Sequence, residues 1–230
     1  MKTLGLIGGM SWESSAVYYD LINRKVKCKL GGLHSCQSLL YTVDFAEIET
    51  LQHQGNWVEL DNIMADAAQR LERAGSDLII LCTNTMHLCT DAIIKAINVP
   101  FLHIADATAQ AIKAQGLSKV GLLGTRFTME QDFYRERLEE EHAIEVFIPK
   151  KASRMEVHRI IYDELVLGDI RPESKILYQQ VIADLEQQGA QGIILGCTEI
   201  PLLIGAGDVN IPVFDTTRLH AELAVELLFE

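Results

Sequence analysis

Two similar segments of the chain place reactive or hydrogen-bonding side chains directly after an apolar run. In IILGCTE the run ends at Cys197, and in LIILCTNT it ends at Cys82 and Thr83. A cysteine between a buried strand and a helix N-terminus lies near orphan N–H groups and the positive end of the helix dipole, which lower the pKa of its thiol. We therefore expect Cys197 to be a thiolate base or nucleophile. The alternative is a small buried residue that only fills the strand end.

Polar residues beside these positions could bind an anionic group. Backbone N–H groups at helix N-termini bind carboxylates, and Asn84, Thr85 and Thr198 are adjacent candidates for contacting such a ligand. Glu199 is a further candidate, which either tunes the thiol by a hydrogen bond or occupies the first turn of a helix, where acidic residues are favoured. One loop could thus supply both a base and an anion site.

The elements that must position these loops are short apolar runs separated by amphipathic stretches. The runs are continuous rather than alternating, as in parallel strands buried on both faces. Between them, for instance over residues 57–74, apolar residues recur three and four positions apart, which predicts helices. The pattern predicts an α/β fold with parallel sheets. The predicted strands cover residues 3–7, 38–43, 77–82, 100–104, 119–123, 145–148, 192–195 and 211–214.

Three ordered pairs of similar segments indicate an internal duplication. The pairs are TLGLIGG and KVGLLGT, GSDLIILCTNT and GAQGIILGCTE, and NVPFLHI and NIPVFDT, at offsets of 116, 114 and 112 residues. The duplication predicts two pseudo-symmetric lobes, one of residues 1–97 with 215–230 and one of residues 98–214. The offset of 114 makes Thr83 the counterpart of Cys197.

Open α/β sheets bind ligands at the carboxyl ends of their strands. We therefore expect the active site to lie in a cleft between the two lobes, formed by the loops after the first and third strands of each. Thr83 and Cys197 would then stand on opposite faces of one bound carbon. One group could remove a proton and the other could return one.

The motifs resemble the aspartate/glutamate racemase family over nearly the whole chain. LIILCTNTMH and ILGCTEIPLL are similar to its two signature segments, and LGLIGGMSWES and VHRIIYDELVLGDI are similar to its amino-acid racemase branch. The resemblance implies a racemase of Asp or Glu that uses neither PLP nor a metal and acts through two cysteines. It also implies that Gln52 contacts the substrate, although spacing alone indicates a solvated polar residue.

The chain departs from the family at the first catalytic cysteine, which is replaced by Thr83 with Cys82 one residue earlier. Either Cys82 turns into the site, or the register holds and Cys82 points into the packing, because consecutive strand residues face opposite sides. The offset of 114 favours the second reading. A threonine hydroxyl is too weak an acid to replace a thiolate, and in the family the later cysteine generally serves the L-enantiomer. We therefore expect a preference for L-Asp or L-Glu.

Several other residues follow the predicted strands. Met10 comes after Gly8 and Gly9, where the backbone could approach a ligand or simply turn; Thr125 and Thr128 are candidate hydrogen-bond donors to the substrate. A predicted helix also carries His158, Asp163 and Glu164, and its acidic residues indicate a solvated face.

The composition is that of an ordinary globular protein, with 48% hydrophobic residues and a net charge of −12. This charge argues against nucleic acid and anionic membrane surfaces as partners. The apolar run at the N-terminus is too short for a signal peptide, so we expect a cytoplasmic protein. The five cysteines lack a CxxC pair and predict no metal site. A homodimer would be ordinary.

Two other functions fit the same residues. A chain with one ready thiol could be a decarboxylase or isomerase of a dicarboxylic acid, as in single-cysteine relatives of the wider fold group. Two α/β lobes around a cleft would also suit a non-catalytic amino-acid binding module.

Overall fold

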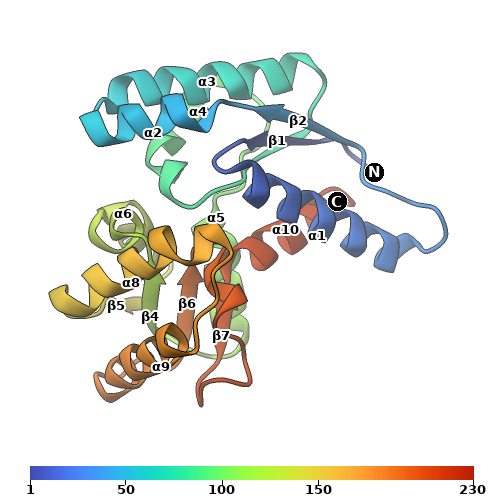
Figure 1. Ribbon diagram of the computed structural model, residues 1–230. Helices are drawn as coiled ribbons and strands as arrows, with labels where there is room; N and C mark the ends of the chain where they lie inside the picture. The colour runs from blue at the N-terminus through green and yellow to red at the C-terminus, as the bar shows by residue number, and fades with distance from the viewer. The chain divides into compact units, whose positions relative to one another are not determined.

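The computed structural model describes residues 1–230 and divides into two compact units (Figure 1). One unit contains Met1–Ile104 and His220–Glu230, and the other contains Ala105–Leu219. Both boundaries lie a few residues later than those we predicted. The units exchange helices near these boundaries: α5 (Ile104–Ala114) belongs almost entirely to the second unit, and α10 (Thr216–Leu227) packs mainly in the first.

The first unit is built on a parallel sheet of three strands in the order β2-β1-β3. The predicted strand at residues 100–104 is wrong in extent: it is reduced to one parallel bridge between Phe101 and Ile79, because α5 already begins at Ile104. The strands are β1 (Leu4–Gly8), β2 (Ser38–Thr42) and β3 (Leu78–Leu81). The helices before α5 are α1 (Trp12–Leu30), α2 (Phe45–Gln54), α3 (Trp57–Arg73), the 3₁₀ helix η1 (Thr85–Cys89) and α4 (Thr90–Ala96).

The second unit is built on a parallel sheet of four strands in the order β5-β4-β6-β7. Its strands are β4 (Lys119–Gly124), β5 (Glu145–Phe147), β6 (Ile193–Gly196) and β7 (Val213–Asp215). Its other helical elements are α6 (Arg126–Glu130), α7 (Asp132–Glu136), the π-helical turn η2 (Arg137–Glu141), α8 (Lys151–Asp163), η3 (Leu165–Leu167), α9 (Pro172–Gln187) and η4 (Ile200–Leu202). The two parallel sheets flanked by helices confirm the predicted α/β fold.

The strand register repeats between the two sheets as the duplication predicts. Gly5 of β1 pairs with Ile79 of β3, and the residues at offsets of 116 and 114, Gly121 and Ile193, pair in the same way. The Phe101 bridge corresponds to the pairing of Ile193 with Val213. The two third strands are therefore equivalent residue by residue.

Each unit also has a buried tyrosine on the helical segment after its first strand. Tyr18 hydrogen-bonds through its hydroxyl to Nδ1 of His220 at 2.8 Å, and Tyr134 donates to Oγ1 of Thr108 at 2.9 Å. The partners lie on α10 and α5, the exchanged helices, at an offset of 112. Each exchanged helix is thus fixed to its unit by an equivalent hydrogen bond.

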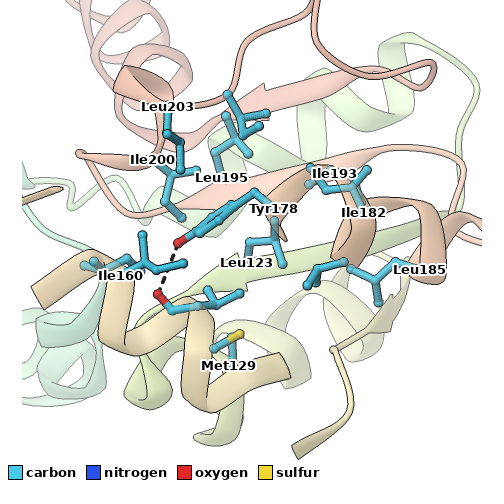
Figure 2. Packing of buried hydrophobic residues seen from close by; sticks show 14 of the residues in the cluster. Leu123, Met129, Ile160, Tyr178, Ile182, Leu185, Ile193, Leu195, Ile200 and Leu203 are labelled. Atoms are coloured by element: carbon cyan, nitrogen blue, oxygen red, sulfur yellow. Dashed lines mark hydrogen bonds between the residues drawn. The ribbon is translucent and has the colours of Figure 1, made fainter. Parts of the chain in front are cut away.

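The sheets are covered by apolar side chains on both faces, which explains the continuous hydrophobic runs. In the second unit the ring of Tyr178 lies among Leu123, Leu195 and Ile200, and its hydroxyl donates to the carbonyl oxygen of Val157 at 3.1 Å (Figure 2). None of the helices has the length and apolar character needed to cross a membrane.

Candidate active site

Cys197 lies one residue beyond β6, at the carboxyl edge of the second sheet. Gly124 of β4 pairs with Gly196 of β6, so the residues that follow them, Thr125 and Cys197, leave the sheet side by side. A Cβ atom on Gly196 would lie 2.9 Å from the carbonyl oxygen of Leu123. Glycine before Cys197 is therefore needed for the close approach of the two strands.

The thiol of Cys197 is hydrogen-bonded to the carboxylate of Glu199. The sulfur donates to Oε2 at 2.8 Å, and the half-buried cysteine packs against the apolar cluster around Tyr178. Burial, followed by the negative charge of Glu199 and the hydrogen bond to it, raises the pKa of the Cys197 thiol well above its ordinary value. The backbone N–H groups of Glu199 and Thr198 act in the opposite direction.

Our expectation of a lowered thiol pKa at Cys197 is therefore wrong. The helix that we expected after it is only the three-residue 3₁₀ helix Ile200–Leu202. Such a short element has almost no dipole, because the dipole is the sum over aligned peptide units. The nearby carboxylate has the larger effect on the thiol. In the resting protein Cys197 is a thiol that donates to a carboxylate.

Thr125 and Thr128 have structural roles at the end of β4. Oγ1 of Thr125 accepts from the backbone N–H of Thr128 at 3.3 Å and caps α6. Thr128 is fully buried, and its methyl group lies under Gly124 and Gly196. Thr128 thus supports the two strand ends, whereas Thr125 stands beside Cys197.

Two residues that we expected on one helix, His158 and Glu164, are engaged in structure, although we expected a solvated face for the acidic one. Nδ1 of His158 accepts from the backbone N–H of Arg126 at 3.2 Å and so holds the loop of Thr125. Glu164 is 1% exposed and bound by Arg159, Arg171 and Ser174. The sequence feature that could have indicated this buried carboxylate is the presence of Arg159 five residues before it and Arg171 seven residues after it.

In the first unit Thr83 occupies the position equivalent to Cys197. It lies four residues beyond Ile79, as Cys197 lies four residues beyond Ile193. Thr83 is half-buried, whereas Cys82 is completely buried in the cluster that contains Leu4. Burial raises the pKa of the Cys82 thiol. The side chain of Cys82 is therefore part of the core packing.

His87 holds the Thr83 loop in place. Its Nδ1 lies 2.8 Å from the carbonyl oxygen of Thr83, and its Nε2 accepts from the backbone N–H of Ile104 at 3.2 Å. Because a carbonyl oxygen can only accept, the ring is the neutral Nδ1–H tautomer. The ring is 1% exposed and packs against His103, at 4.5 Å between centroids.

Other candidate residues of the first unit gather at the same edge of its sheet. Met10 follows β1, and Met86 follows the Thr83 loop; both belong to one apolar cluster. Nε2 of Gln52, on α2, contacts Sδ of Met86 at 3.0 Å, and the glutamine is buried. The structure thus brings Met10, Gln52 and the loop of Asn84 and Thr85 together. In the second unit it does the same for Thr125, Cys197, Thr198 and Glu199.

A group of possible metal ligands, Asp106, Glu141 and His142, lies in the second unit. Arg137 donates to both oxygens of Asp106, at 2.6 and 2.8 Å, and His142 lies 2.8 Å from one of them. The carboxylate of Asp106 is therefore engaged in an ion pair that anchors α5 to η2.

Residues 7–224 match the family model described as Asp/Glu/Hydantoin racemase. The chain belongs to this family. The match includes Thr83, Cys197 and every other candidate residue named above.

Among the relatives, a crystal structure of a putative Asp/Glu racemase from Yersinia pestis is 56% identical, with all of both chains covered and a TM-score of 0.96. The structure of an aspartate racemase homologue from Pyrococcus horikoshii is 38% identical, again with all of both chains covered, and has a TM-score of 0.88. The broad specificity amino-acid racemase RacX of Bacillus subtilis is 25% identical over 232 residues, which cover 96% of each chain. Family membership and these relatives identify the chain as an amino-acid racemase homologue, that is, an isomerase.

Proposed function

We propose that this protein interconverts the enantiomers of an acidic amino acid, Asp or Glu, without a cofactor. In this proposal Cys197 exchanges the α-proton on one face and Thr83 stands on the other. The observation that supports it best is the repeated strand register, which makes Thr83 and Cys197 equivalent while Cys82 is buried in the core.

The two groups differ in what they can do to the α-carbon. A thiolate at Cys197 can remove the α-proton of the L-enantiomer. The hydroxyl of Thr83 does not ionise near neutral pH, but it can pass a proton from water to the carbanion. Proton removal from the D-enantiomer would need Thr83 as a base. We therefore propose a preference for L-Asp and L-Glu over the D-forms.

The substrate carboxylates would be bound by the polar groups around these two positions. Asn84, Thr85, Thr125 and Thr198 supply amide, hydroxyl and backbone N–H donors at the two strand edges. Met10 and Gln52 would form the apolar and amide parts of the same site. Gln52 contacts Met86, and Met86 belongs to the same apolar cluster as Met10. Since these donors are neutral, the dicarboxylic substrate would be recognised chiefly by hydrogen bonds.

The test is a chiral assay of the wild type and three variants with both enantiomers of Asp and Glu. Proton removal is followed in parallel by α-deuterium wash-in from heavy water. Cys197→Ser should lose nearly all turnover. Cys82→Ala is the matched control and should keep it, because that thiol is buried in the core. Thr83→Cys should increase wash-in into the D-enantiomer relative to the L-enantiomer.

Two results would contradict this proposal. Equal rates of α-deuterium wash-in into both enantiomers by the wild type would refute the proposed L-preference. Loss of activity in Cys82→Ala without loss of folding would show that Cys82, and not Thr83, is the second proton-transfer group.

A second function is favoured by the replacement of one catalytic thiol. A single-cysteine decarboxylase or isomerase of a dicarboxylic acid would also need Cys197. Failure of the wild type to form the opposite enantiomer of Asp or Glu would support that function.

A further inference from the structure

The edge of the second sheet that carries Cys197 has little positive charge among its candidate substrate groups. Thr125 and Thr198 are neutral, and Glu199 is a carboxylate. The chain as a whole has a net charge of −12, and a field of this sign repels an anionic substrate. An enzyme that prefers an acidic to a neutral amino acid therefore needs a cation at this edge.

Arg126 is the cation next to these groups. Thr125 and Cys197 leave the sheet side by side, and Arg126 follows Thr125 as the first residue of α6. The backbone N–H of Arg126 donates to Nδ1 of His158 at 3.2 Å. Because this bond uses the backbone, it holds the residue in place whatever its side chain.

The guanidinium of Arg126 is exposed and forms no ion pair within the protein. It lies over the ring of Phe127, 5.8 Å from the centroid. A guanidinium that stacks on an aromatic face keeps the N–H donors of its edge for a carboxylate. The other arginines between residues 105 and 171 all bind carboxylates of the protein, and they are Arg135, Arg137, Arg154, Arg159 and Arg171.

The other cations at this edge of the sheet are less well placed. Arg218, on α10, lies near Asp215: burial raises the pKa of that carboxyl, and the charge of Arg218 acts against the rise. Lys150 and Lys151 come after β5, which is separated from β6 by β4. Arg126 thus combines a position beside the Cys197 loop with a charge that no carboxylate of the protein offsets.

We propose that Arg126 binds the side-chain carboxylate of the substrate and makes the enzyme prefer acidic to neutral amino acids. This inference rests on the proposed function. A guanidinium can donate two parallel N–H bonds to the two oxygens of a carboxylate. A carboxamide offers one oxygen, and its NH₂ group would face the N–H donors of the arginine. The two kinds of side chain should therefore be separated by charge and by geometry.

The test compares L-Asp with L-Asn and L-Glu with L-Gln, pairs that have nearly the same shape and differ in charge. Dissociation constants are measured by isothermal titration calorimetry, and KM and kcat by chiral chromatography. The variants are Arg126→Gln and Arg126→Lys. Arg73→Gln is the matched control, because Arg73 is also exposed and free of ion pairs but lies at the end of α3 in the first unit.

The wild type should bind L-Asp more tightly than L-Asn. Arg126→Gln should weaken the binding of L-Asp by about tenfold, the effect of losing one hydrogen bond to a charged group, and should leave L-Asn almost unchanged. KM should rise more than kcat falls, because the bound carboxylate does not react. Arg126→Lys should lie between the two, since it keeps the charge without the planar fork. Arg73→Gln should match the wild type.

Three results would overturn the assignment of Arg126. They are a wild type that binds L-Asp no more tightly than L-Asn, an equal loss for both ligands in Arg126→Gln, and an equal loss for L-Asp in Arg73→Gln. Binding does not depend on turnover. A wild type that binds L-Asp through Arg126 but racemises neither Asp nor Glu would refute the proposed function alone.

Discussion

His87→Phe should destabilise the first unit and loosen the Thr83 loop. Phenylalanine has nearly the same shape as histidine but removes the Nδ1–H donor to Thr83 O and the Nε2 acceptor of Ile104 N–H. With the ring 1% exposed, water has little access to replace these bonds. Loss of partners for buried polar groups costs about 1–3 kcal/mol each, so we expect a loss of about 2–4 kcal/mol in the free energy of unfolding.

The two tryptophans, Trp12 and Trp57, both lie in the first unit. Tryptophan fluorescence during urea denaturation therefore reports on the unit that His87→Phe changes. His53→Phe is a matched control on the exposed surface of α2 and should change stability by less than about 0.5 kcal/mol. A loss below about 1 kcal/mol in His87→Phe would show that the hydrogen-bonded ring does not anchor the loop. Racemisation should fall in the same variant while alkylation of Cys197 stays unchanged.

Two further predictions concern the second unit. Burial alone would raise the pKa of the Glu164 carboxyl, but hydrogen bonds from Ser174 and Arg159 and the charge of Arg171 hold it below the ordinary value of 4.5. A lowered pKa gives stability that is present above the unfolded-state pKa and lost as pH falls through the folded-state pKa. Glu164→Gln should therefore lose about 1.5–3 kcal/mol at pH 7 and show a smaller further loss between pH 5 and 3 than the wild type, by circular dichroism in urea; equal acid slopes would contradict this. Gly196→Ala should cost about 1–3 kcal/mol and reduce turnover, because its Cβ would lie 2.9 Å from Leu123 O. Gly207→Ala, where a Cβ meets nothing within 4 Å, is the control for both readouts.

The repeated segments determined the most about the site before any coordinates were considered. Their offsets predicted the parallel pairing that β1 and β3 share with β4 and β6, and hence the equivalence of Thr83 and Cys197. They also favoured an inward Cys82, which lies in the core. These features depend on period and register, which are local properties of the chain and can be counted along it.

Contacts between distant residues could not be counted in this way. The bridge at Phe101 is short because α5 begins early. His87 is oriented for its hydrogen bond to Thr83 O by a second hydrogen bond, from the backbone N–H of Ile104, which lies 17 residues further along the chain.

The electrostatic state of Cys197 was decided by tertiary structure. The residue types Cys197 and Glu199 were visible in the sequence, and a strand followed by a helix would have lowered the thiol pKa. Folding instead buries the thiol against the Tyr178 cluster and turns the carboxylate of Glu199 toward it. A pKa depends on burial and on distances between charges. The sequence by itself therefore determined which residue we propose to carry the chemistry, and only the tertiary structure decided which group holds its proton.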